Sequence, residues 1–161
     1  MHFAGGGHAS QAINGGASLK LNGAEENLFV NCTVGVDTIA AATGMMGMVV
    51  DGAGPRNVFR DCHFTMKASN AGAAFVEMVD GSAFDRYMIF KDCVFINFGT
   101  TMTEVFVVPA WDGTNRKVLL IDSYFTGATD WESNDRGCVV HSMGTRTTGG
   151  NAGVLLASTA A

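Results

Sequence analysis

The residues best placed to carry out chemistry are three aspartates, Asp61, Asp92 and Asp122, which recur at spacings of 31 and 30 residues. Stacked carboxylates could bind calcium or flank a glycosidic bond as an acid and a base. Asn31 continues the same column 30 residues before Asp61. Asn and Asp both form bends through local side-chain hydrogen bonds, but Asn carries no charge. We therefore interpret Asn31 and the three aspartates as a column of bends, and we predict no catalytic, cofactor-binding or metal-binding residue.

The bend column belongs to a longer repeated segment. It occurs four times without gaps, as Asn27–Val34, Asn57–Phe64, Met88–Phe95 and Val118–Phe125. Its third column holds Phe29, Phe59, Phe90 and Leu120, its sixth holds Cys32, Cys62, Cys93 and Ser123, and its eighth holds Val34, Phe64, Phe95 and Phe125. An apolar run that ends in Asn-Gly or Asp-Gly precedes each segment, and these dipeptides favour turns because they tolerate positive φ.

This repeat predicts the fold. No unit contains a helical apolar period, and strands at a fixed period indicate a solenoid or a propeller, whose blades need ~40 residues or more. We predict an all-β fold, a single right-handed parallel β-helix of about five coils with a period of about 30 residues. Equivalent residues would lie ~4.8 Å apart in neighbouring coils, so the aromatic and cysteine columns would form the core. We assign residues 17–161 to this domain and residues 1–16 to a flexible, glycine-rich N-terminal arm.

Composition excludes some partners and favours others. The net charge is −5 and no basic run is present, so we expect no nucleic-acid partner. No apolar stretch approaches the ~18 residues that cross a membrane, so we expect no membrane partner. Charged residues make up 16% of the chain, below the usual ~25%. Such a surface is typical of a protein that lies against partners.

Three further features admit more than one interpretation. The methionines of Gly44–Val50 form either a pliable contact surface or the interior of a strand. Trp111 and Trp131 could stack on carbohydrate, but we favour packing against a neighbouring subunit. His63 lies between two core positions, Cys62 and Phe64, and should face away from the core.

The repeated run, for example Asn57–Phe64 and Met88–Phe95, resembles the coil signature of right-handed parallel β-helix proteins, the architecture of pectate lyases and phage tailspikes. It is closest in character to the short β-helix proteins of tailed-phage virions, including capsid cement or decoration proteins. The resemblance spans Ser18 to Leu156 and implies the fold more strongly than the function. No catalytic motif of those enzymes is matched, so no catalytic residue is carried over.

A β-helix needs protection at both ends, because its terminal coils expose unpaired backbone groups. We see no amphipathic capping helix in the sequence and therefore expect a symmetric oligomer, by analogy a homotrimer. The resemblance implies a non-enzymatic protein of the virion, assembled in the host cytoplasm and located on the capsid surface. It would stabilise the phage head by bridging major capsid protein subunits or by binding another virion protein. The alternatives are a tailspike-like module that binds or cleaves polysaccharide, and a free lectin-like protein.

Overall fold

Short strands form where β-branched and aromatic residues that face the core alternate with residues that face outward. The computed structural model describes residues 1–4, 16–79, 83, 86–108, 116–132, 139–141 and 146–147. Three sets of three strands follow one another along the chain: β2 (Ala17–Asn22), β3 (Leu28–Val30) and β4 (Thr33–Ala41), then β5 (Met46–Asp51), β6 (Val58–Arg60) and β7 (His63–Ala68), then β8 (Ala74–Met78), β9 (Arg86–Lys91) and β10 (Val94–Asn97).

The remaining strands continue the same path. They are β11 (Met102–Glu104), β12 (Phe106–Val107), β13 (Arg116–Ile121), β14 (Tyr124–Thr126), β15 (Ala128–Asp130), β16 (Val139–His141) and β17 (Arg146–Thr147), with β1 (His2–Phe3) at the N-terminal end.

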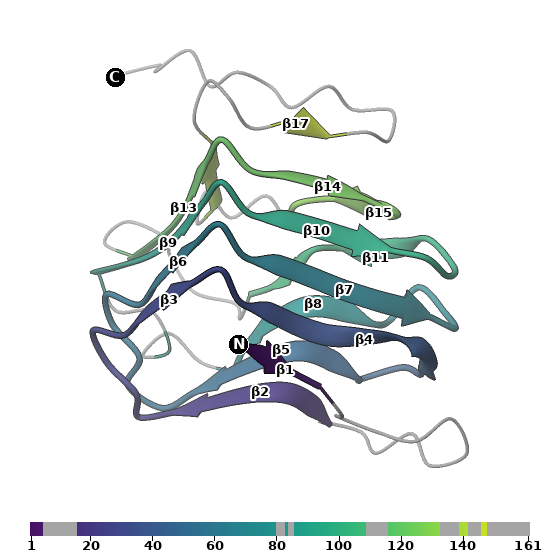
Figure 1. The fold of residues 1–161 in the computed structure, drawn as a ribbon, viewed down its shortest axis with the longest axis horizontal. Helices are drawn as coiled ribbons and strands as arrows, with labels where there is room; N and C mark the ends of the chain where they lie inside the picture. Colours follow the sequence, from purple (N-terminus) through teal and green to yellow (C-terminus); the bar gives the residue numbers. More distant parts are fainter. Residues whose placement is uncertain are drawn as a thin grey trace.

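Three stacked parallel sheets form the walls of the solenoid (Figure 1). We name them sheet I (β3-β6-β9-β13-β16), sheet II (β1-β4-β7-β10-β14-β17) and sheet III (β2-β5-β8-β12). Strands β11 and β15 form a further parallel pair. Each turn of the chain passes from sheet III to sheet I and then to sheet II. All of these pairings are parallel, which excludes antiparallel hairpins among the paired strands.

The prediction of an all-β parallel solenoid with a period of about 30 residues is confirmed, but the number of coils is smaller than predicted. The structure has about three turns, whereas the sequence suggested about five. Beyond the fourth repeated segment the sequence has two strand candidates for a fifth coil, Cys138–His141 and Val154–Leu156. Of these, the structure describes Val139–His141, as β16 paired with β13, while Val154–Leu156 lies outside the described residues.

The extreme N-terminus differs from the predicted arm. His2 and Phe3 form β1, which pairs with β4 in the register His2↔Thr33 and Phe3↔Val34. The Phe3 ring meets the Phe29 ring edge-on at 6.1 Å. Residues 2–3 therefore cover the end of sheet II, and residues 5–15 of the predicted arm lie outside the described residues.

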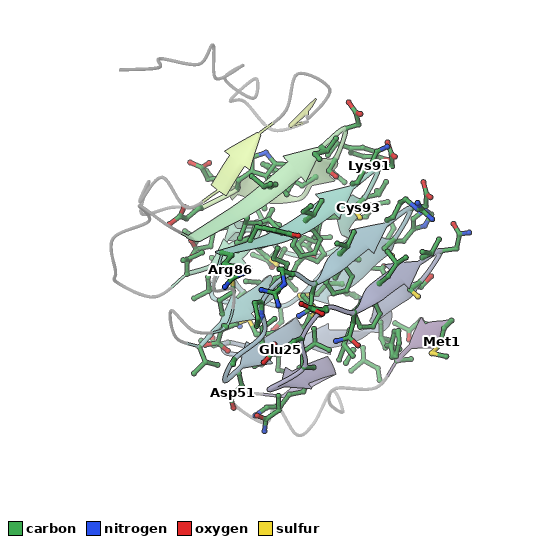
Figure 2. The ribbon with its side chains drawn as sticks, turned by 90° about the vertical axis from the view of Figure 1, so that its left-hand side faces the viewer. Met1, Glu25, Asp51, Arg86, Lys91 and Cys93 are labelled. Carbon is green, nitrogen blue, oxygen red and sulfur yellow. The ribbon has the colours of Figure 1, made fainter. Side chains whose placement is uncertain are left out.

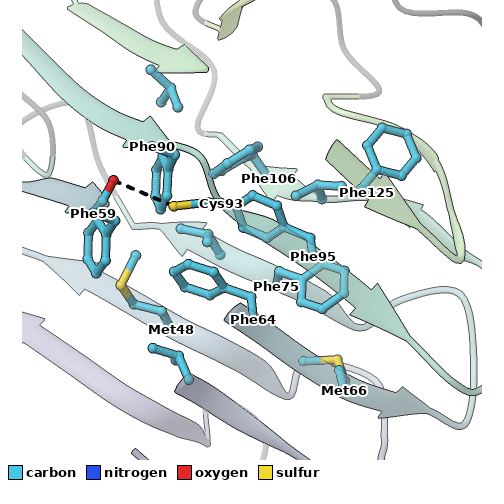
Figure 3. Packing of buried hydrophobic residues seen from close by; sticks show 14 of the residues in the cluster. Met48, Phe59, Phe64, Met66, Phe75, Phe90, Cys93, Phe95, Phe106 and Phe125 are labelled. Carbon is cyan, nitrogen blue, oxygen red and sulfur yellow. Dashed lines mark hydrogen bonds between the residues drawn. The ribbon is translucent and has the colours of Figure 1, made fainter. Parts of the chain in front are cut away.

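The core between the sheets is built from stacked phenylalanines (Figure 3). In sheet I the Phe59 ring stacks on Phe29 at 4.6 Å and on Phe90 at 4.9 Å, and Phe90 is in register with Leu120. In sheet II, Phe64 stacks on Phe95 at 4.7 Å. Edge-on contacts join the two columns, as between Phe64 and Phe90 at 5.7 Å. Offset and edge-on aromatic pairs add about 0.5–1.5 kcal/mol each beyond the burial of their area.

Further members of the eighth column extend the sheet II stack. Val34 is in register with Phe64, and Phe95 is in register with Phe125. All four of these side chains have no exposed surface. The methionines of Gly44–Val50 are also buried, which favours the strand interior over a contact surface: Met45 and Met48 belong to the main core and Met46 to a second, smaller cluster.

The expectation for Trp131 was wrong. The indole is 2% exposed and lies inside the same chain, 4.6 Å from the Phe125 ring and 5.6 Å from the Phe95 ring. It follows β15, so the backbone turn that ends this strand directs the side chain into the solenoid. Trp131 therefore fills the core and offers no surface for a neighbouring subunit or a sugar. Trp111 lies outside the described residues.

Candidate functional site

The bend between sheets I and II contains the predicted Asn/Asp column. Asn31, Asp61, Asp92 and Asp122 all have a left-handed backbone, with φ between 48° and 53°. Asn and Asp adopt this conformation more readily than other residues that carry a Cβ, which explains their recurrence at this position. All four side chains are exposed to solvent. The bend turns the chain between two walls of the solenoid and leaves the side chains outside.

The carboxylates of this column lie beside basic residues that end strands of sheet I. Arg60 lies 3.7 Å from Asp61, and Lys91 lies 3.6 Å from Asp92. The side chains of these pairs are between 41% and 49% exposed, so each pair contributes little to stability in water. The basic side chains reduce the electrostatic repulsion between the stacked carboxylates.

The next column is a series of small buried polar groups. The Cys62 thiol donates to the carbonyl oxygens of Arg60 and Phe29 at 3.2 and 3.5 Å. The Cys93 thiol makes the equivalent bonds to the Lys91 carbonyl at 3.3 Å and to the Phe59 carbonyl at 3.5 Å, the second of which Figure 3 shows. In the next coil the Ser123 hydroxyl bonds to the Ile121 and Phe90 carbonyls at 3.0 and 3.1 Å. Each group shares its single proton between a carbonyl of its own coil and a carbonyl of the preceding coil, both on sheet I.

This bonding explains why Ser replaces Cys in the last coil of the column. Cys32, in the first described coil, bonds to the Val30 carbonyl at 3.4 Å and is 8% exposed. Interaction with the Cys62 thiol and burial both raise the pKa of Cys93. The Cys93 thiol is therefore poorly suited to act as a nucleophile.

The connection between sheets III and I begins with the predicted Asn-Gly and Asp-Gly turns, where Gly23 and Gly52 have φ values of 60° and 68°. A second bend follows in the same connection and was not predicted from the sequence. Glu26, Arg56 and Arg86 have φ values of 56°, 58° and 73°, and the Arg56 guanidinium pairs with the Glu26 carboxylate. Beside them, the fully buried Asn57 amide accepts from the Asn27 backbone N–H at 2.9 Å and donates to the carbonyls of Ala24 and Gly54 at 2.8 and 2.9 Å. In the sequence, the 30-residue spacing of Asn27 and Asn57 was the signal from which this bend could have been predicted.

The aspartate column offers little for acid–base or metal chemistry. Asp61 lines a shallow polar hollow of about 170 Å³ with Asn31, Cys32, Thr33 and His63. Glycoside hydrolysis needs two carboxyl groups across a bond, and this hollow is lined by one. Among the described residues, no group of three or more His, Cys, Asp or Glu side chains is arranged to hold a metal ion. His63 is exposed, on the outer face of sheet II.

The outer face of sheet I carries a column of aliphatic side chains. Leu28, Val58, Ile89 and Leu119 are in register on successive strands and alternate with the buried phenylalanine column. We call these four residues the outer stripe. Leu28 is 60% exposed and the other three are half-buried, and none of the four belongs to a core cluster of the described chain. Figure 2 faces this side of the molecule and labels Arg86 and Lys91 at the two ends of β9.

A second outward column separates the outer stripe from the bend. It holds Val30, Arg60, Lys91 and Ile121, which are in register with one another. The aspartates of the bend follow immediately, so adjacent positive and negative columns border the outer stripe on this side. The outer stripe is therefore an apolar surface with a rim of both charges.

The outer face of sheet II is more polar. The corresponding column holds Thr33, His63, Val94 and Tyr124, again in register. The next outward column contains Gly35, Thr65, Ile96 and Thr126. Gly35 has φ +105°, and a Cβ there would lie 2.0 Å from the Thr65 carbonyl oxygen. Close stacking of the backbone therefore requires glycine at this point.

In comparisons with known proteins, no family model, no curated protein and no solved structure matches this chain. In the described part of the chain, no helix has the length and apolar character required to span a bilayer.

Proposed function

We propose that this protein is a non-enzymatic structural component of a virus particle, a cement or decoration protein that stabilises a phage head. In this proposal a homotrimer sits on the capsid surface and bridges neighbouring subunits of the major capsid protein. Its action is mechanical, because additional buried interface raises the free energy needed to separate the subunits.

The observation that carries the proposal is the exposure of large apolar side chains on separate faces. Leu28 lies on the outer face of sheet I, Tyr124 on that of sheet II, and Phe98 just after β10, where the chain leaves sheet II. Their exposed fractions are 60%, 39% and 61%. An aromatic side chain exposed to this extent is typical of a binding surface. A protein that contacts its own copies and a shell needs such residues on more than one face.

The bend column supports a structural role over the polysaccharide alternative. Its side chains point to solvent at left-handed bends, and Asp61 and Asp92 lie beside Arg60 and Lys91. This arrangement suits a repeated turn better than a pair of catalytic acids facing across a groove.

The test is to find the chain on native particles. Particles purified from the virus that encodes the chain would be analysed by quantitative mass spectrometry and by electron cryomicroscopy. The proposal predicts a fixed ratio of this chain to the major capsid protein, with density on the outer surface of the head. Absence of the chain from the particles, together with turnover of a glycan by the isolated chain, would contradict it.

A binding assay identifies the face involved. Purified chain would be added to shells that lack it, and both the bound fraction and the temperature of shell opening would be measured. We expect Phe98→Ser to lower binding and remove the stabilisation. Val79→Ser is the matched control, because Val79 is a 46% exposed apolar residue that follows β8 of sheet III. Equal loss in the two variants would show that Phe98 is not a specific contact.

A further inference from the structure

The outer stripe is a second apolar layer on strands whose inner layer already forms the core. Strands covered on both faces have near-continuous apolar sequences, whereas strands with one solvent face alternate. β9 reads Arg-Tyr-Met-Ile-Phe-Lys, with Met88 and Phe90 inside and Tyr87 and Ile89 outside. β13 repeats this with Leu120 inside and Leu119 outside. Sheet I therefore has the sequence of a sheet covered on both sides, although the described chain covers its inner face alone.

We propose that the outer stripe binds a second copy of this chain. The stripe repeats its side chains at the spacing of stacked strands, ~4.8 Å. A surface that repeats at the same interval can interdigitate with it along its whole height, as paired sheets do at a separation of ~10 Å. A second copy of this chain necessarily has strands stacked at the same spacing, whereas an ordinary globular partner does not.

The charges beside the outer stripe favour the same occupant. Arg60 and Lys91 form one column, and Asp61 and Asp92 form the next. Because each copy carries both columns, a second copy can offer a carboxylate to each cation and a cation to each carboxylate. A partner with a surface of one charge would meet repulsion from one of the two columns.

A contact of outer stripe on outer stripe relates two copies by a two-fold axis, so it adds to the proposed function a contact separate from those within the homotrimer. The inference rests on the self-assembly in that proposal but not on attachment to a shell. It is tested with the full chain and no capsid protein present. Sedimentation velocity would be measured from low micromolar to several hundred micromolar chain. We expect wild-type protein to sediment with the mass of two or more copies, and Ile89→Glu to weaken association by about tenfold or more, because it buries an unpaired charge in the contact.

Val94→Glu is the matched control. Val94 is a half-buried outward residue of the same coil, but on sheet II. We expect this variant to associate like the wild type. If Ile89→Glu does not fold, Ile89→Thr takes its place in the test. Thr keeps the β-branched shape and adds a hydroxyl, so this variant should weaken association measurably while its circular dichroism spectrum stays unchanged.

Three results would overturn the inference. These are a wild-type chain that is monomeric over the whole concentration range, an Ile89→Glu or folded Ile89→Thr variant with wild-type association, and a Val94→Glu variant that dissociates as fully as the Ile89 variants. A chain that associates through the outer stripe but is absent from particles would leave this inference standing and contradict the capsid role.

Discussion

Sheets I and II have similar inner faces and different outer faces. Inside, both carry in-register apolar columns, Phe29-Phe59-Phe90-Leu120 in one and Val34-Phe64-Phe95-Phe125 in the other. Outside, sheet I has the four aliphatic residues of the outer stripe, whereas sheet II has Thr33, His63, Val94 and Tyr124. The inner columns are what the fold requires. The outer columns are not constrained by the fold, so their difference is the basis of our proposal that sheet I, and not sheet II, contacts another copy.

The largest expected effect tests whether the two inner faces are equivalent. Phe90 and Phe95 are both fully buried, and their rings are 5.7 Å apart. We expect Phe90→Ala and Phe95→Ala each to lower the free energy of unfolding by about 3–5 kcal/mol. Urea denaturation at low protein concentration measures this. Ile89→Ala, on the outer face of the same strand as Phe90, should cost less than ~1 kcal/mol, and equal losses at positions 89 and 90 would reverse our assignment of the faces.

A second prediction concerns the end of sheet II. The Asn97 side chain accepts from the backbone N–H groups of Ala68 and Gly99, both at 2.9 Å, and donates to the carbonyls of Thr100 and Gly127 at 2.7 and 2.8 Å. Asn97→Ala leaves buried groups without these bonds, which should cost about 1–3 kcal/mol. Thermal unfolding provides the measurement. Thr100→Ala is the control because its side chain is exposed, and a wild-type melting temperature for Asn97→Ala would refute the prediction.

A third prediction separates the backbone role of the bend from any role of its charge. Asp92 has φ 52°, so Asp92→Val places a β-branched residue in a left-handed conformation and should cost about 1–2 kcal/mol. Asp92→Asn keeps the bend and removes the charge, so its free energy of unfolding should stay within ~0.5 kcal/mol of the wild type. Chemical denaturation compares the two. If Asn destabilised as much as Val, the carboxylate would matter more than the bend.

A fourth prediction concerns the dependence of stability on pH. Because the pKa of Cys93 is raised in the folded chain, the folded state keeps this proton while the unfolded state loses it above ~pH 8.5. Stability should therefore fall as the pH rises above this value, by up to about 1.4 kcal/mol per unit. Urea midpoints at about pH 8 and about pH 10 would be compared. Cys93→Ser, which copies Ser123, should show a smaller alkaline loss, and an equal loss would assign it to other groups.

The sequence was most informative where geometry repeats. The Phe, Cys and Asp columns predicted the strands, the period and the bend between sheets I and II, because stacking places equivalent residues in equivalent environments. The same logic fails where the repeat is interrupted. Trp131 lies outside the columns recognised in the sequence, so no column showed that it was buried. Strands β11 and β12 replace one strand of the earlier coils with two short ones.

The second bend shows a different limit. Its residues, Glu26, Arg56 and Arg86, have no shared chemical property that favours a left-handed backbone. The conformation is set there by the packing of the neighbouring Asn27 and Asn57 amides, which can be recognised only when the coils are stacked. The candidate contact surface, by contrast, had a signal in the sequence that was not used: once Phe90 is assigned to the core, alternation along the strand turns Ile89 outward.

The near-constant spacing between paired residues has a consequence for how the chain folds. Phe64 meets Phe95 31 positions later, and Phe29 meets Phe59 after 30. The entropy of closing a loop depends on its length, so every coil closes at nearly the same cost, wherever it lies. Folding can begin at any two adjacent coils and spread in both directions. A longer version of this chain would therefore add coils that each close at about the same entropic cost as the first.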